Sequence, residues 1–170
     1  AVADPLSGLA CAGCAALAVL YSHPRVVAKG HPLGGPLVNV LGYGVASPLA
    51  GWAVADVTVN PRTLVVWALA CLGILGTYFA AQAFQQDEDR ARGYRTLVAT
   101  HGPAATLAVT RLCVGAALTG GLVLAAVGWV PRACLLGVVG GWSVDRWLAA
   151  WARVPGGGGE THARGFARRM

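Results

Sequence analysis

The charged residues of this chain stand in clusters, and long uncharged stretches separate these clusters. Residues 63–86 form a stretch of 24 residues without a formal charge, and residues 112–131 form another of 20. A helix of a soluble protein needs a polar face and therefore carries charges every few residues. An uncharged stretch of about 20 residues is instead long enough to cross the hydrocarbon core of a membrane as a helix. The charge pattern therefore predicts a membrane protein.

The composition supports the same interpretation. Only 12% of the 170 residues are charged, whereas about 25% is typical of a soluble domain. The hydrophobic share of 56% and the mean hydropathy of +0.59 exclude a disordered chain. We predict an all-α fold, a polytopic transmembrane helix bundle that forms a single domain over residues 1–170.

Five stretches of the sequence are long and apolar enough to serve as membrane spans. They cover residues 6–21, 36–55, 63–84, 103–128 and 133–152. The fifth differs from the others, because Asp145 and Arg146 interrupt it and three tryptophans, Trp142, Trp147 and Trp151, lie within it. This pattern is also typical of an amphipathic helix that lies partly at the membrane interface.

The basic residues predict how the bundle is oriented. Nine of the 13 lie in the connections at 22–35 and 85–102 and in the C-terminal tail. Because positively charged connections stay on the cytoplasmic side, we expect these segments to be cytoplasmic. The orientation bias also accounts for most of the net charge of +6, so we expect membrane lipid and not nucleic acid as a partner. The use of 12 arginines against one lysine suggests a bacterial inner (plasma) membrane.

The two ends of the sequence suggest a piece of a longer protein. The chain opens on Ala1 without a basic leader, and it ends shortly after the glycine-rich residues 155–159. We therefore expect an internal fragment, in which residues 154–170 form a cytoplasmic connection or tail.

A polar cluster, residues 85–97, follows the third predicted span. It opens Gln85-Gln86-Asp87-Glu88-Asp89, and Arg90, Arg92 and Arg95 follow, which could contact a diphosphate. We expect the acids to lie at the C-terminal end of the span helix, where the helix dipole disfavours negative charge, so that a cation should be bound. Mg²⁺ suits such a place, because it takes one or two carboxylates and completes its shell with water and phosphate oxygens. Alternatively, the acids and arginines neutralise one another in a solvated loop.

Two motifs resemble those of a known family, the UbiA-type intramembrane prenyltransferases. The segment D-R-A-R-G-Y-R-T-L at 89–97 is similar to a family motif, and so is Tyr21-Ser22-His23-Pro24 with Lys29 downstream. The resemblance implies a nine-helix bundle in which the five spans correspond to helices four to eight. It also implies Mg²⁺-dependent transfer of an isoprenyl group from a prenyl diphosphate to an aromatic or other lipophilic acceptor.

The resemblance also implies roles for individual residues. The polar cluster corresponds to the second aspartate-rich motif of the family, D-x-x-x-D, in which Asp89 is the second aspartate and Gln85 replaces the first. Asp87 or Glu88 would then supply the missing negative charge for Mg²⁺. The implied diphosphate ligands are Lys29, Arg90, Arg95 and Tyr21. The first motif of the family, of the N-D-x-x-D type, is absent from these 170 residues, so we expect this fragment alone to be inactive.

The sequence leaves two questions open: which residues line the substrate cavity, and which of several functions the chain has. Asn39 is a polar residue within a predicted span, so it should face the bundle interior and the substrate cavity. Tyr78, with Tyr43 or Phe79, could stabilise a carbocation through its ring, or such aromatic residues could simply pack. The alternatives to a prenyltransferase are a non-enzymatic transporter or scaffold and a catalytically inert fragment. A transporter would place ionisable residues near the middle of the membrane, whereas the acidic cluster lies at its surface.

Overall fold

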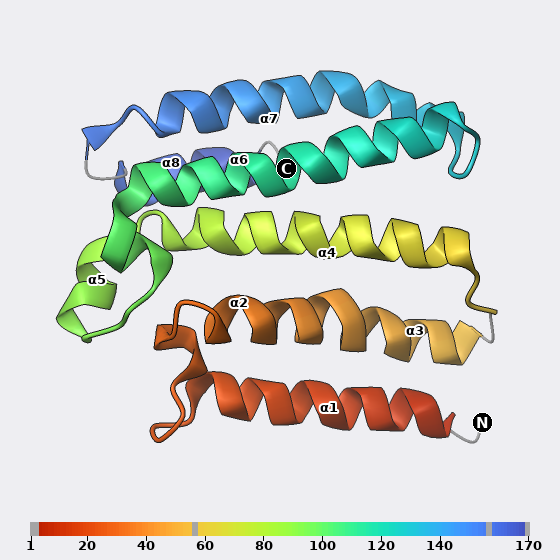
Figure 1. Cartoon of the computed structure of the whole chain (residues 1–170), viewed down its shortest axis with the longest axis horizontal. Helices are drawn as coiled ribbons and strands as arrows, with labels where there is room; N and C mark the ends of the chain where they lie inside the picture. Colours follow the sequence, from red (N-terminus) through yellow and green to blue (C-terminus); the bar gives the residue numbers. More distant parts are fainter. Residues whose placement is uncertain (1–3, 56–57, 156–157, 169–170) are drawn as a thin grey trace.

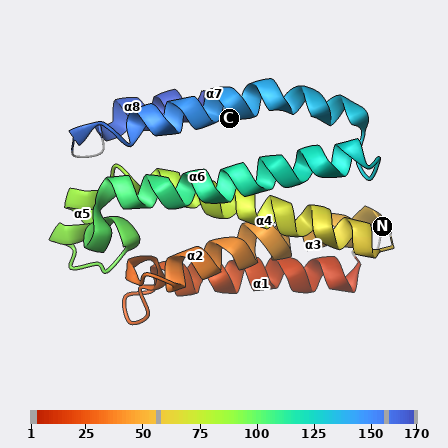
Figure 2. The same ribbon diagram turned by 45° about the horizontal axis from the view of Figure 1, so that its top comes forward.

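The computed structural model describes residues 4–55, 58–155 and 158–168, and in these residues it contains helices and no strand. The long helices lie side by side in chain order, and α1 and α7 form the two edges of the row (Figures 1 and 2). Four helical stretches are long and apolar enough to cross a membrane: Pro5–Ser22 (α1), Gly34–Ala55, Pro61–Gln82 (α4) and Leu97–Ala126 (α6). The all-α membrane bundle is therefore confirmed.

The second span contains a stretch of wider helix. Its three parts are α2 (Gly34–Asn39), the π-helical η2 (Val40–Ala46) and α3 (Ser47–Ala55). The Gly44 carbonyl in η2 accepts hydrogen bonds from two α4 side chains, from Nε1 of Trp67 and from Sγ of Cys71 at 3.3 Å. A Cβ on Gly44 would lie 2.8 Å from the Cys71 sulfur, so the glycine allows α4 to approach closely.

The third span, α4, begins and ends two residues before the predicted limits of 63 and 84. Its N-cap is Asn60, whose Oδ1 accepts from the Thr63 N–H at 3.0 Å, and Pro61 occupies the first helical position. After Gln82 the chain turns and enters a new short helix, α5 (Gln86–Ala91), at the end of the bundle (Figure 1).

The prediction that the acidic residues lie at the C-terminal end of the span helix was wrong. Asp87, Glu88 and Asp89 lie in the first turn of α5. The free N–H groups of a first turn favour negative charge, so the acids are well placed there without a bound cation. The position of these acids along the chain therefore does not by itself require a bound cation.

The fourth span, α6, starts at Leu97, six residues before the predicted start. Its helix is interrupted at Gly102, which has φ 82° and precedes Pro103. The predicted span of 103–128 therefore began at the kink. Gly76 of α4 lets the two helices pack closely, since a Cβ there would meet Val114 at 2.6 Å.

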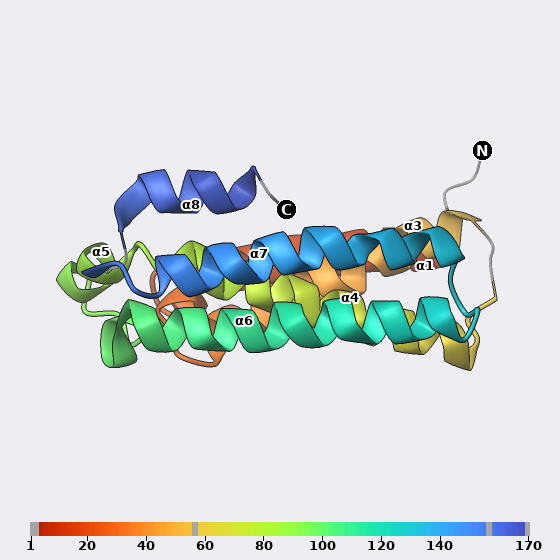
Figure 3. The same ribbon diagram turned by 90° about the horizontal axis from the view of Figure 1, so that it is seen from above.

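The fifth predicted span is divided into two helices. Residues 132–136 form a 3₁₀ helix, η3 (Arg132–Leu136), and α7 covers Gly137–Trp151. With 15 residues, α7 is shorter than each of the four helical stretches that are long and apolar enough to cross a membrane, and it is not among them. Within the predicted tail lies α8 (Gly159–Ala167), which runs outside α7 and places His162 6.3 Å from the ring of Trp147 (Figure 3).

Candidate functional site

Two connections meet at one end of the bundle. The segment between α1 and α2 includes the short 3₁₀ helix η1 (Ala28–Gly30), and the segment between α4 and α6 includes α5 (Figure 1). The Arg95 N–H donates to the Gly30 carbonyl at 2.8 Å and joins the two segments. The Tyr94 ring lies directly over Gly30, where a Cβ would come within 2.7 Å of it. Together these contacts fix the two connections relative to each other.

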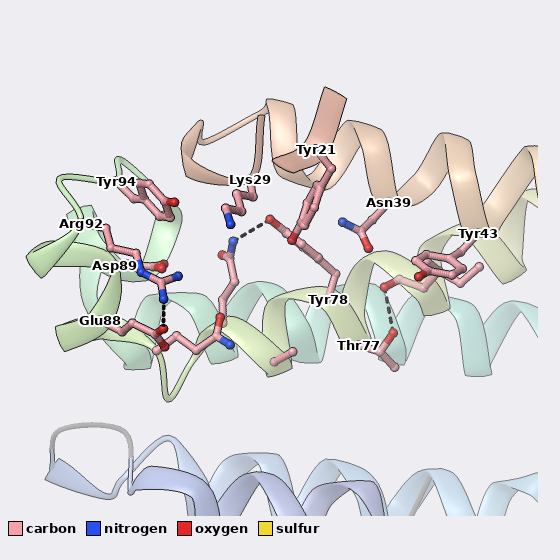
Figure 4. Close-up of a pocket in the computed structure, with 14 residues that line it drawn as sticks. Tyr21, Lys29, Asn39, Tyr43, Thr77, Tyr78, Glu88, Asp89, Arg92 and Tyr94 are labelled. Atoms are coloured by element: carbon pink, nitrogen blue, oxygen red, sulfur yellow. Dashed lines mark hydrogen bonds and ion pairs between the residues drawn. The ribbon is translucent and has the colours of Figure 1, made fainter. Parts of the chain in front are cut away.

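A cavity of about 620 Å³ lies between these connections and the adjoining helices (Figure 4). It brings together seven of the predicted site residues: Tyr21, Lys29, Asn39, Tyr78, Gln85, Glu88 and Asp89. Tyr43 also lines it. Phe79 is instead buried and packs edge-to-face against Tyr78, with the two ring centroids 5.5 Å apart. The charged residues come from η1 and from α5 with its C-cap residue Arg92. Most of the uncharged polar residues come from the long helices, and Gln85 and Tyr94 come from the connection around α5.

Three other predicted site residues do not line this cavity. Asp87 is exposed on α5. Arg90 donates through Nε to the Ala99 carbonyl at 3.2 Å, and Arg95 contributes its backbone N–H to the contact with η1. The two arginines therefore hold the polar segment in place.

The cavity also contains Arg92, one of the three arginines of the polar cluster that could contact a diphosphate. Arg92 forms an ion pair with Glu88, with 2.6 Å between Nη2 and Oε1, and its guanidinium lies 6.0 Å from the ring of Tyr94. Both members of the pair are about half exposed, so the ion pair contributes little stability. The spacing of four residues brings the two side chains of the pair together.

Asp89 is the most tightly held acid of the site. Its side chain is only 7% exposed, and Oδ2 accepts a hydrogen bond from Thr96 Oγ1 at 2.5 Å. Its carbonyl accepts from the Tyr94 N–H at 2.8 Å. These contacts leave Oδ1 without a donor from the described residues, so one carboxylate oxygen remains able to bind a cation.

Uncharged polar groups line the cavity beyond the acids. Gln82, one turn after Tyr78 on α4, donates through Nε2 to the Tyr78 hydroxyl at 2.7 Å. Tyr21 approaches Tyr78 from α1 (Figure 4). Asn39 donates to the Gly35 carbonyl at 3.0 Å. The sequence prediction did not include Gln82, although it is a polar residue inside the predicted third span, as Asn39 is inside the second.

Gly35 provides the space for the Tyr78 hydroxyl, since a Cβ at this position would lie 2.1 Å from that oxygen. We expect Gly35→Ala to displace Tyr78 from Gln82 and to lower the free energy of unfolding by about 1–3 kcal/mol. Thermal unfolding in detergent would measure this loss. The control is Gly13→Ala in α1, where no neighbouring atom lies within 4 Å of the new Cβ. Equal melting temperatures for the two variants would contradict the proposed close contact.

A second cavity, of about 590 Å³, adjoins the first between α1 and the second span. The two cavities share Tyr21, Asn39 and Tyr43. The second is lined largely by small and apolar residues such as Ala15, Leu17, Ala18, Val38 and Gly42. A ligand with a charged end and an apolar end could therefore occupy both cavities at once.

The donor atoms of the site suit a cation that shares its coordination with a ligand. In the part of the chain that the structure describes, no three His, Cys, Asp or Glu side chains form a metal-binding group. Glu88 and Asp89 do line one cavity, together with the amide group of Gln85. One or two carboxylates with water and phosphate oxygens are the usual coordination of Mg²⁺. The residues present therefore fit Mg²⁺ bound together with a phosphate ligand.

The chain was compared with known protein families, curated proteins and solved structures. A sequence model described as the UbiA prenyltransferase family matches residues 1–161, which is nearly the whole chain. No individual curated protein and no solved structure gives a significant match.

Proposed function

Because the chain belongs to the UbiA prenyltransferase family, we propose that it takes part in Mg²⁺-dependent transfer of an isoprenyl group from a prenyl diphosphate to an aromatic or other lipophilic acceptor. One observation carries this proposal: a single cavity contains the acids Glu88 and Asp89 and the bases Lys29 and Arg92. A diphosphate ester bound with Mg²⁺ needs both kinds of group. The cavity also continues into an apolar one, as a prenyl chain requires.

Asp89 and Glu88 would hold Mg²⁺, with Gln85 as an uncharged ligand. The ion would supply positive charge to the departing diphosphate. Lys29 and Arg92 would contact the phosphate oxygens, and Tyr21 would donate a hydrogen bond to them. Of the three arginines of the cluster, we assign this role to Arg92, because the side chains of Arg90 and Arg95 do not line the cavity.

In the reaction, the bond between the allylic carbon and the diphosphate oxygen breaks, and the oxygen keeps the electron pair. The acceptor carbon then bonds to the allylic carbon, and the acceptor loses a proton. The faces of the Tyr43 and Tyr78 rings would stabilise the allylic cation. The second cavity would hold the apolar tail and keep water away from the reacting carbon.

The placement in the cell and the extent of the active protein are part of the proposal. The two connections that form the site carry the basic residues, so we place this end of the bundle on the cytoplasmic side of a bacterial inner membrane. We also propose that the first aspartate-rich motif comes from a longer parent protein. The full-length protein should therefore be active, and residues 1–170 alone should be inactive.

The direct test is a transfer assay with membranes that contain the full-length protein. Radiolabelled prenyl diphosphates of several lengths and a panel of lipophilic acceptors are supplied with Mg²⁺ or with EDTA. Prenylated product that forms only with Mg²⁺ would support the proposal. If no product forms with any acceptor, the chain is better explained as a non-enzymatic membrane bundle.

Gln85 provides a test of the metal site, because it stands where the family motif has an aspartate. We expect Gln85→Asp to lower the Mg²⁺ concentration for half-maximal transfer on the order of tenfold, since an added ligand charge strengthens binding of a hard cation. The measurement is a Mg²⁺ titration of the transfer rate. Gln86→Asp, just outside the cavity, is the matched control. An equal shift for both variants would show a general charge effect instead of coordination.

A further inference from the structure

A third cavity, of about 380 Å³, lies at the end of the bundle opposite the candidate site, where α4 begins (Figure 1). Three tryptophans from three segments line it: Trp52 of α3, Trp67 of α4 and Trp129 of the connection after α6. The rings of Trp52 and Trp67 are stacked with their centroids 5.9 Å apart, and Nε1 of Trp67 donates to the Gly44 carbonyl. These contacts hold two walls of the cavity in place.

Arg62 is the charged residue that lines this cavity. Its guanidinium lies 5.5 Å from the centre of the Trp129 ring, so the indole holds the cation at the cavity. Arg62 forms no ion pair with the described residues, and Asp56, the acid nearest to it in the sequence, lies outside them. Asn60 and Thr63 line the cavity beside Arg62. A guanidinium group next to amide and hydroxyl groups suits a phosphate group, because it presents several N–H donors in one plane.

An apolar groove continues from this cavity toward the middle of the bundle. Ala70 lines both the third cavity and a fourth, of about 260 Å³, between α4 and α6. The other residues of the fourth cavity are also apolar: Leu69, Gly73, Val114, Ala117 and Leu118. Between Arg62 and Gly73 the helix α4 rises by about 16 Å. This rise is close to half of a hydrocarbon core of roughly 30 Å. The two cavities together therefore have the depth of one membrane leaflet, with a cation at the surface and apolar walls below it.

We propose that the third and fourth cavities bind an anionic phospholipid in the leaflet opposite the candidate site. Its phosphate contacts Arg62, and one acyl chain follows the groove between α4 and α6. A negative headgroup is preferred because a choline headgroup brings a second cation next to Arg62. Tryptophans at a membrane surface can also act only as anchors for helix ends. Here, however, they surround a cavity and hold an arginine over it, which an anchor does not require. The proposed site lies far from the main cavity and does not depend on prenyl transfer.

Native mass spectrometry of the detergent-purified full-length protein tests this proposal directly. The probes are phosphatidylglycerol and phosphatidylcholine with the same acyl chains, and inorganic phosphate. We expect phosphatidylglycerol to bind about fivefold more tightly than phosphatidylcholine, which is the usual contribution of one arginine near an anionic membrane surface. Inorganic phosphate should not displace phosphatidylglycerol, because it has no chain to occupy the groove.

Three variants assign the preference to this site. Arg62→Gln should remove the preference for phosphatidylglycerol, whereas Arg62→Lys keeps the charge and should retain it. Arg132→Gln is the matched control, because it removes the same charge at the same end of the bundle but outside both cavities. Ala70→Phe fills the place where the two cavities meet, so it should weaken the binding of both lipids and leave Arg62 and the preference unchanged. It also serves as the second test if Arg62→Gln does not fold.

The outcomes separate this inference from the proposed function, because none of them uses transfer activity. A preference for phosphatidylglycerol that Arg62→Gln removes and Arg132→Gln leaves intact supports the inference. Equal binding of the two lipids to the unchanged protein overturns it, and so does a preference that survives Arg62→Gln. Displacement by inorganic phosphate would show a site for the free anion instead of a lipid. If no lipid binds at all, another segment of the longer protein covers the two cavities and the inference is wrong.

Discussion

Replacing Asp89 with asparagine should lower the rate of Mg²⁺-dependent prenyl transfer by about a hundredfold or more. The change removes one negative charge from a buried carboxylate and keeps the size of the side chain and an acceptor for Thr96 Oγ1. Losing one well-placed electrostatic group in an active site costs on the order of 100- to 1,000-fold in rate. The loss should exceed this range if Mg²⁺ no longer binds, and Asp89→Ala should abolish transfer.

The neighbouring acids provide the comparison for Asp89. Glu88→Gln should also lower the rate and should raise the Mg²⁺ requirement, because Glu88 lines the cavity. Asp87→Asn removes the same charge from an exposed position outside the cavity and should change the rate less than about twofold. Initial rates across a Mg²⁺ titration distinguish these cases. Full activity of Asp89→Asn would overturn the proposed role of Asp89. A large loss of transfer rate in Asp87→Asn would show that Asp87, and not Glu88, is the second carboxylate that binds Mg²⁺.

The positions of the long helices could be predicted from the sequence because the lipid environment excludes charge over a fixed length. The ends of the helices were harder to predict. Asn60 and Pro61 carry the usual signals of a helix start, and the predicted limit at residue 63 overlooked them. The end of α4 carries no such signal, because Ala83 and Phe84 continue the apolar pattern after Gln82. Only the packing of the chain shows that the helix stops there.

The turn after Gln82 explains why some site residues were predicted and others were not. It starts a new helix, and the direction of α5 decides which of its side chains reach the cavity. Glu88 and Asp89 of this helix and its C-cap residue Arg92 line the cavity, and Arg90 does not. A motif gives the order of residues along the chain and cannot give this direction. Asp89 was identified because the motif marks it, whereas the cluster offered three arginines and only the position of the helix distinguishes Arg92 from the other two.

Gln82 and Asn39 illustrate the same limit inside the spans. A polar residue in an apolar stretch predicts an inward side chain, and Asn39 does line the cavity. The sequence does not show whether such a residue is satisfied within its own helix. Asn39 donates to the carbonyl one turn earlier, whereas Gln82 keeps an oxygen without a partner. This difference comes from the tertiary position of Tyr78.

The ion pair between Arg111 and Asp145 should add to the stability of the α6–α7 contact, beside the apolar packing of the two helices. Arg111 lies near the middle of α6, and its Nε and Nη2 donate to the two oxygens of Asp145 on α7 at 2.9 and 3.0 Å. A single charge at the centre of a membrane helix costs about 2.5–3.5 kcal/mol. The two side chains of this pair are 41% and 55% exposed. Arg111→Leu leaves Asp145 unpaired and should lower the melting temperature by roughly 5–10 °C.

The double variant Arg111→Leu with Asp145→Leu shows whether pairing is the cause. Replacing both charges with apolar groups removes the unpaired charge, so most of the lost stability should return. Arg146→Leu is the control, because Arg146 lies 5.1 Å from the ring of Trp142 without an ion pair in the described residues, and its loss should cost less than about 1 kcal/mol. Thermal unfolding in nanodiscs measures all four proteins. If the double variant is as unstable as Arg111→Leu, the arginine stabilises α6 through packing and the paired charges do not hold the two helices together.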